Sequence, residues 1–427
     1  MIKKPFFGLG KPKLSYSRID DVAHDIQDIP PSDKLFLSLT CDKQDMQNLA
    51  ISTGNEVRTG QRLRPFPTLE TYLTSGATGV ITDISLKTES FGPPLLSVCI
   101  EAGQRDLWDA EFEKRGIKPD SEDAPSFLSG LPGISDLTAL VRKENPLDAI
   151  VVSGLDQDLL IATNQLSIKN GTEHLAQGID DLKKMTGVDR VILVVPSSLR
   201  SEAEKGGVDV RVMDPVYPYA LPRLLIKEIL GITTPPARAL TDVNVGVISA
   251  ETVIALGQTF AEGKPPVTKV LTVIDKNNRS LGVRARVGTP AKHILNALKI
   301  TVTEGDRLVF GGPMTGRGIY SEEIPIGPGT DAIMVQDKGQ VTPASSDPCV
   351  NCGECVRACP ARLPVNMLIR LLENGLYEEA AREYNLLSCV ECGLCSYVCI
   401  MQIPIYHYIM LGKHELASTG NLEESNA

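Results

Sequence analysis

Two short cysteine runs near the end of the chain constrain it more than any other feature. CVNCGECVRACP spans 349–360 and CVECGLCSYVC spans 389–399, and both have the spacing C-x2-C-x2-C-x3-C. Three thiolates two residues apart can wrap one face of a cubane cluster, and a fourth, three residues later, points away toward a neighbouring cluster. The two runs therefore predict two ferredoxin-type [4Fe–4S] clusters.

The same rule predicts which cysteines share a cluster. If the fourth cysteines cross, one cluster is bound by Cys349, Cys352, Cys355 and Cys399, and the other by Cys389, Cys392, Cys395 and Cys359. Gly353 and Gly393 lie inside the loops, where the absence of a Cβ lets the backbone turn tightly. Pro360 follows the fourth cysteine of the first run, whereas Ile400 takes that place in the second.

Two other uses of cysteine fit the pattern less well. Structural zinc sites usually show two C-x2-C pairs separated by a longer loop. Disulfide frameworks belong to small secreted chains, and this chain has 427 residues and no recognisable signal peptide. Cys41 and Cys99 lie far from both runs, and we expect them to be small buried apolar residues.

Length and charge limit the possible functions. A chain of 427 residues should form about two to four domains. The net charge of -10 argues against a nucleic-acid partner, which would need a basic face. Oxygen-sensitive clusters imply a reducing compartment, so we expect the cytoplasm. We find no apolar run long enough to span a bilayer, so membrane association would depend on partner proteins.

The remaining sequence predicts a multidomain chain of the α/β and α+β classes. We expect an N-terminal arm at 1–34, followed at 35–105 by interlocked hairpins that form a barrel-sandwich resembling lipoyl carriers. The carrier's lysine is missing from the turn at 75–79, so carrier chemistry is not expected. Apolar strands at 148–154, 190–196 and 208–214 alternate with helical stretches at 173–185 and 221–231, and predict a parallel sheet within an α/β domain at 106–236.

Three further segments complete the predicted organisation. A helix at 250–261 and a small β-grasp-like module make up 237–340. The region 341–416 holds both cysteine runs and short amphipathic helices at 365–373, 376–384 and 405–416. We expect a disordered polar tail at 417–427.

In this order the segments resemble the RnfC family, which belongs to the Rnf ion-translocating ferredoxin:NAD oxidoreductase. The resemblance rests chiefly on GGPMTG at 311–316, with VGTP at 287–290, and on NLLSCVECGLCSYVC at 385–399. It implies a barrel-sandwich hybrid, an α/β domain like the flavin-bearing subunit of complex I, a soluble-ligand-binding (SLBB-like) β-grasp module and a helical dicluster domain.

Family members of the full type bind FMN and NADH through three motifs, and this chain departs from all three. Where the family has a glycine-rich run, this chain has SGLPGISDL at 129–137. Leu155 to Asp158 take the place of an acidic motif, and Tyr217 to Pro222 take the place of Y-P-x-G-G-E. Glycines and a free helix N-terminus are needed for close approach to phosphate. We therefore expect FMN and NADH binding to be absent, and the chain to be a divergent member.

These features predict an electron-transfer subunit without a catalytic residue of its own, peripheral on the cytoplasmic side of the inner membrane. Its expected partners are membrane-embedded subunits and a soluble electron carrier or redox subunit. Two alternatives remain: an NADH-oxidising, FMN-containing enzyme subunit, or a docking adaptor of a redox complex. Arg357 and Arg362 flank the first cysteine run, and we interpret them as solvated surface charge.

Overall fold

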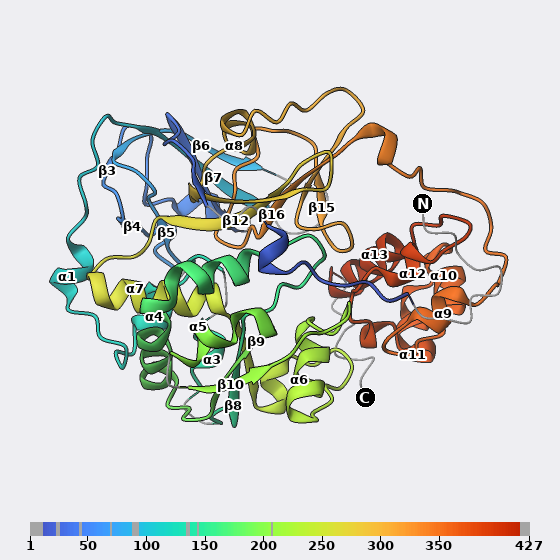
Figure 1. The fold of residues 1–427 in the computed structure, drawn as a ribbon. Helices are drawn as coiled ribbons and strands as arrows, with labels where there is room; N and C mark the ends of the chain where they lie inside the picture. The colour runs from blue at the N-terminus through green and yellow to red at the C-terminus, as the bar shows by residue number, and fades with distance from the viewer. Residues whose placement is uncertain are drawn as a thin grey trace.

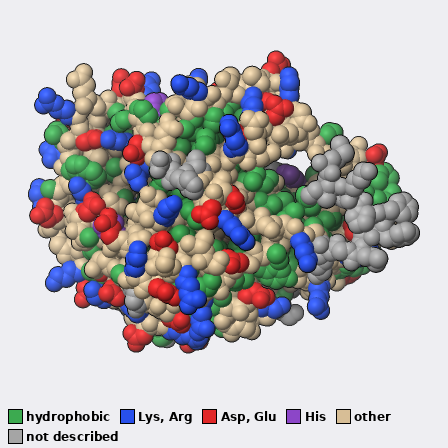
Figure 2. Space-filling view, viewed as in Figure 1, with side chains coloured by type: hydrophobic (Ala, Val, Ile, Leu, Met, Phe, Trp, Pro, Cys, Tyr) green, Lys and Arg blue, Asp and Glu red, His purple; other side chains and the backbone are tan. Residues whose placement is uncertain are grey.

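A computed structural model of the chain describes residues 12–22, 26–41, 45–68, 71–87, 94–133, 137–142, 145–205 and 208–418. Figure 1 shows a body built of β-sheets and an α/β layer, with helices α9 to α13 forming a lobe at one end. We call residues 349–418 the cluster lobe. Basic and acidic side chains are interspersed over the face of the body seen in Figure 2. Most of the tail expected at 417–427 lies outside the described residues.

A four-stranded parallel sheet is the centre of the α/β layer. Its order is β10-β9-β8-β11, built from Asp209–Val212, Val191–Val195, Ala149–Ser153 and Val245–Ser249. Every residue of β8 and β9 is buried, which explains why these strands are continuous apolar runs. The predicted parallel sheet is confirmed.

Strand β11 corrects one predicted boundary. It pairs with β8 in the parallel register Val247 to Val151, and the helix that follows it packs on the same sheet. Residues 237–262 therefore belong to the α/β layer, and grouping them with the following module was wrong. VGVIS is short and contains Gly246, so it gives little strand signal by itself.

Helices cover both faces of this sheet. On one face lie α4 (Thr163–Thr186) and α7 (Ala250–Glu262), and on the other lies α6 (Pro222–Leu230). Helix α4 is kinked at Gly171, whose backbone angles are not helical, and the segment after the kink contains the helix predicted at 173–185. The segment before it, from Thr163, was missed because its buried polar side chains are hydrogen-bonded and show no apolar periodicity. Helices α4 and α7 approach closely at Gly178, where an added Cβ would lie 1.9 Å from the Val253 carbonyl oxygen.

Two β-rich parts complete the body. The first has an antiparallel sheet of order β2-β7-β6-β3 and a separate pair β4-β5, formed by Lys34–Thr40, Leu95–Ala102, Gly79–Lys87, Glu56–Val57, Arg62–Leu63 and Leu73–Thr74. The second is a mixed sheet of order β1-β13-β12-β16-β14-β15, formed by Gln27–Asp28, Ser280–Arg286, Thr268–Ile274, Ala332–Gln336, Arg307–Phe310 and Arg317–Ile319. Helix α8 (Ala291–Ala297) packs on it.

Short helices connect these parts. They are α1 (Glu111–Arg115), α2 (Ala124–Phe127), α3 (Leu137–Leu140) and α5 (Arg200–Glu204). The described part of the N-terminal arm runs along the body: β1 joins the mixed sheet beside β13, and Ser15 forms a bridge with Val216 ahead of α6. Within the described residues, no helix is both long enough and apolar enough to cross a membrane.

The cluster lobe contains an internal repeat. Helices α9 (Glu354–Ala358) and α10 (Val365–Leu372) in the first half correspond to α12 (Leu394–Tyr397) and α13 (Ile405–Ser418) in the second, with α11 (Tyr377–Tyr384) between them. Positive φ angles recur at equivalent places, in the pairs Asn351 and Glu391, Gly353 and Gly393, Arg362 and Gln402. The repeated cysteine spacing thus coincides with a repeated backbone.

Candidate metal centre

The two cysteine loops share a local structure that directs backbone N–H groups at sulfur. The N–H of Asn351 donates to Cys349 Sγ, and the N–H of Glu391 donates to Cys389 Sγ, both at 3.4 Å. The N–H of Leu363 donates to Cys359 Sγ at the same distance. Such bonds stabilise charge on a thiolate, which is the form that ligates iron.

The thiols of the first run lie near one thiol of the second. Burial, reinforced by negative charge on Cys349 and Cys352 and more weakly on Cys399, raises the pKa of Cys355 to about 11. A small hollow is lined by these same four cysteines, with Val350 and Ile400 at its edge. Cys399 therefore faces the cysteines of the other run.

The second set has the reciprocal composition. Burial, reinforced by charge on Cys389 and Cys359, raises the pKa of Cys392 to about 12. Burial also raises the pKa of Cys395 well above its usual value, and Cys389 and Cys392 contribute. Cys359, from the first run, is thus within electrostatic range of the second loop.

The donor set suits iron–sulfur clusters, because two sets of four cysteine thiolates are the ligands that two [4Fe–4S] cubanes require. Thiolates around a cubane are further apart than those around one ion, because the irons and sulfides lie between them. Buried thiols with raised pKa values also need a strongly positive group to be held as thiolates.

Side chains from other parts of the chain hold the second loop. The buried Tyr217, ahead of α6, donates its hydroxyl to the Cys392 carbonyl oxygen at 2.6 Å. Burial raises the pKa of Tyr217 far above its usual value, so the phenol keeps its proton and remains a donor. Lys413 in α13 donates to the Cys389 carbonyl oxygen at 2.8 Å and pairs with Glu391 at 2.5 Å.

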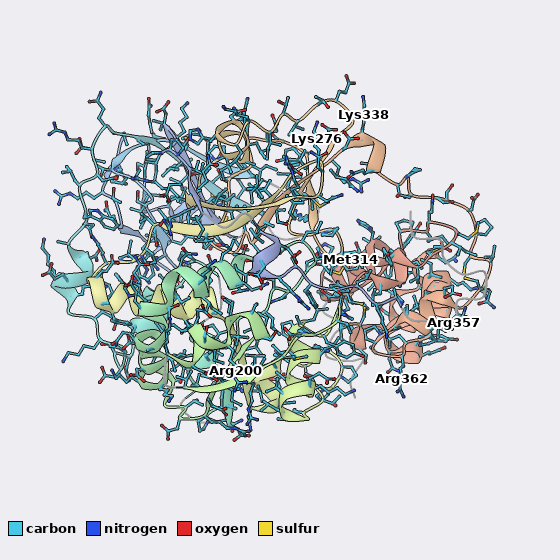
Figure 3. The ribbon with its side chains drawn as sticks, in the orientation of Figure 1. Arg200, Lys276, Met314, Lys338, Arg357 and Arg362 are labelled. Carbon is cyan, nitrogen blue, oxygen red and sulfur yellow. The ribbon has the colours of Figure 1, made fainter. Side chains whose placement is uncertain are left out.

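The GGPMTG segment at 311–316 is the third support of that loop. A Cβ added at Gly393 would lie 2.4 Å from the Met314 carbonyl oxygen, so the two backbones are in direct contact. Figure 3 shows Met314 beside the cluster lobe. The buried carboxylate of Asp158 accepts hydrogen bonds from the backbone N–H groups of Met314 and Thr315 and from the Thr315 hydroxyl. Asp158 thereby holds this segment against the second cysteine loop.

Residues of the chain itself fill the carboxyl edge of the parallel sheet. Gln165 donates to the Ser17 carbonyl oxygen and accepts from the Ile19 N–H. It also donates to the Asp156 carboxylate at 3.0 Å. Nearby, the Tyr16 hydroxyl accepts from the Ala220 N–H. The N-terminal arm therefore occupies the edge at which α/β proteins commonly bind ligands.

The segments that replace the flavin motifs have structural contacts instead. The Gly133 carbonyl accepts from the Ser249 hydroxyl, which also caps the N-terminus of α7 through Thr252 N–H. A Cβ at Gly133 would lie 2.6 Å from that hydroxyl. Residues 134–136 of this run lie outside the described residues. In the third segment, Tyr217 contacts the second cysteine loop as described above.

Two family models match the chain. One is the 4Fe-4S dicluster domain, over residues 344–400, and the other is the NqrA second alpha/beta domain, over residues 138–265. The first match supports iron–sulfur clusters on the cysteine runs. The second spans the parallel sheet and includes β11 and α7, in agreement with the corrected boundary.

The chain is similar to C subunits of ion-translocating oxidoreductase complexes. The RnfC protein of the ion-translocating oxidoreductase complex of Rhodobacter capsulatus is 26% identical over 311 residues, which cover 68% of this chain and 60% of that protein. Its counterpart in the proton-translocating ferredoxin:NAD(+) oxidoreductase complex of Clostridium ljungdahlii is 25% identical over 421 residues, covering 94% of this chain and 92% of that protein. The chain is RnfC-like.

The RnfC-like chain spans about 60% of the length of the Rhodobacter capsulatus relative. A solved chain from an NAD+-reducing [NiFe]-hydrogenase in the H2-reduced state aligns with a TM-score of 0.45 at 14% identity, covering 75% of this chain and 65% of that one. That likeness is too distant to support an argument about function.

Sequence reasoning singled out all eight cluster-lobe cysteines but missed the residues that position the second loop. Tyr217 was considered only as part of a substituted flavin motif, and Asp158 only as part of another. Lys413 was not singled out. Their partners lie 175 and 156 positions away for Tyr217 and Asp158, so no local pattern could have revealed them.

Proposed function

We propose that the chain is the electron-transfer subunit of a membrane-associated, Rnf-like oxidoreductase complex. It would hold two [4Fe–4S] clusters, which supply one-electron chemistry when bound. The observation that carries the proposal is the grouping of eight thiols into two interleaved sets within a stretch that matches a dicluster domain. A docking role is compatible with this function, because several domains pack around the cluster lobe.

The proposed ligand sets cross between the runs. Cys349, Cys352, Cys355 and Cys399 hold the first cluster, and Cys389, Cys392, Cys395 and Cys359 hold the second. The hollow shared by the first four and the charges felt by Cys392 support this assignment. In Cys399→Ser the cluster held by Cys349, Cys352 and Cys355 should be lost or altered in its electron paramagnetic resonance signal. Loss of only the cluster at Cys389 to Cys395 would contradict the crossing.

We propose that the α/β layer binds neither FMN nor NADH. Three observations support this: the arm fills the carboxyl edge, Gly133 and Ser249 cover the N-terminus of α7, and Pro222 removes an N–H from the start of α6. Helix N-termini bind phosphate only when their N–H groups are accessible.

Flavin release and NADH reduction test the choice between relay and NADH-oxidising enzyme. Anaerobically purified protein should release no FMN on denaturation, and NADH should not bleach the cluster absorbance of the isolated chain, whereas dithionite should. Stoichiometric flavin, or rapid bleaching by NADH, would instead support an NADH-oxidising, FMN-containing enzyme subunit.

Finer fold assignments are also proposals. The arm is 1–34, the barrel-sandwich hybrid is 35–105, the α/β domain is 106–265, the SLBB-like β-grasp module is 266–340, the dicluster domain is 341–416 and the tail is 417–427. A single apolar core joins the four-stranded sheet to the β4-β5 pair, as in two facing hairpins. Helix α8 packs on one face of the mixed sheet, as a β-grasp requires.

The proposed surroundings follow from the relatives. Their names describe subunits of ion-translocating or proton-translocating complexes. We propose that this chain is likewise peripheral to a membrane, on the cytoplasmic side of the inner membrane. It would contact membrane-embedded subunits and a soluble electron carrier or redox subunit, and no nucleic acid.

A further inference from the structure

A groove of about 420 Å³ separates the start of α6 from the second cysteine loop. The α/β layer contributes Arg223 and Arg238 to its lining, and the cluster lobe contributes Cys389, Val390 and Lys413. Figure 1 places α6 on the side of the α/β layer that faces the lobe. The groove therefore opens directly beside a cysteine that we propose as an iron ligand.

The charge of the groove is positive although the chain as a whole is acidic. Within the described part of the chain its only lining carboxylate, Glu391, is paired with Lys413 at 2.5 Å. Arg223 donates to the Arg238 carbonyl oxygen at 2.8 Å, and among the described residues neither arginine forms an ion pair. Two guanidinium groups beside the cluster lobe therefore have no carboxylate partner among the described residues.

The first cysteine loop has a different surface. The edge of its hollow carries Val350 and Ile400, both 54% exposed. Its nearby Arg357 is neutralised by Glu354 at 2.5 Å. An apolar edge with paired charge does not favour an acidic partner, whereas the basic groove does.

We propose that this groove is the docking site of a small acidic one-electron carrier protein at the second cluster. The inference rests on the proposed relay function and deepens it by naming the partner's chemistry and its place of contact. Carboxylates around the carrier's redox centre would face Arg223 and Arg238, and long-range attraction would speed encounter. Exchange of one electron there oxidises one member of the pair and reduces the other.

Binding of an acidic bacterial-type ferredoxin, with two [4Fe–4S] clusters of its own, tests the proposal at low and high salt. The double variant Arg223→Glu/Arg238→Glu should raise the dissociation constant at least ~10-fold at low salt. It should also reduce the dependence of that constant on salt. Arg200→Glu is the matched control, because Arg200 lies on α5 away from the cluster lobe (Figure 3) and should leave binding unchanged. Basic cytochrome c should not lose affinity in the double variant, because the added glutamates attract rather than repel it.

Other outcomes overturn the proposal in distinct ways. A larger loss in Arg357→Glu, at a residue that donates to the Cys352 carbonyl oxygen and is labelled on the cluster lobe in Figure 3, would place docking at the first loop. Saturable NADH binding that the double variant weakens would make the groove a nucleotide site. Absence of ferredoxin binding, or equal binding by all variants, would remove the docking role. Iron content is measured first on every variant. Missing iron would mean that the proposed relay function itself fails, whereas a normal iron content with unchanged ferredoxin binding would refute only the docking site.

Discussion

The two loop glycines of the cluster lobe offer a matched pair of substitutions. Gly353 and Gly393 have φ angles of 75° and 70°, so alanine at either place costs about 1–2 kcal/mol for the left-handed conformation alone. Their surroundings differ. A Cβ at Gly393 would lie 2.4 Å from the Met314 carbonyl oxygen, whereas a Cβ at Gly353 would have the Arg357 guanidinium at 3.3 Å as its nearest neighbour.

A flexible arginine end can move aside, but a backbone carbonyl moves only with its segment. Asp158 fixes that segment by accepting three hydrogen bonds from Met314 and Thr315. Overpacking at Gly393 should therefore cost a further ~1–3 kcal/mol. We predict that Gly393→Ala lowers the free energy of unfolding by this amount beyond the effect of Gly353→Ala. Anaerobic urea unfolding, followed by cluster absorbance and circular dichroism, measures the difference. Equal losses, or a larger loss for Gly353→Ala, would refute the packing of Met314 on the second loop.

Two further substitutions test the surroundings of the site. Tyr217→Phe leaves the buried Cys392 carbonyl without its donor and should destabilise the protein by about 1–3 kcal/mol, whereas Tyr320→Phe, at a residue 79% exposed, should have almost no effect in the same urea assay. Burial raises the pKa of Asp156 from 3.8 to about 7. Between these values the folded state retains a proton that the unfolded state loses, so this group's contribution to stability falls as pH rises. Asp156→Asn should remove that downward slope, and an unchanged pH profile would contradict the raised pKa.

Local patterns were sufficient for the parts of the fold that depend on a few neighbouring residues. Strands β8 and β9 are buried on both faces and so appear as unbroken apolar runs. The cysteine spacing is set within each loop, and the glycines inside it adopt the positive φ angles that the turn needs. The buried positions of Cys41 and Cys99 were also predicted correctly.

The rest depends on contacts between distant segments. Strand β11 is recognised only through its pairing with β8, since VGVIS carries little signal of its own. The buried polar residues at the start of α4 have no apolar period, because their partners are other polar groups. The support of the second loop by Tyr217 and Asp158 joins residues more than a hundred positions apart, which a single sequence does not encode in any local spacing.

Metal and sulfide analysis of anaerobically purified protein tests the central claim most directly. Two clusters on the eight cysteines of the cluster lobe require about eight irons and about eight acid-labile sulfides per chain. We predict that stoichiometry, with little zinc. Stoichiometric zinc with little iron and no labile sulfide would contradict the assignment of the cluster lobe and, with it, the proposed relay.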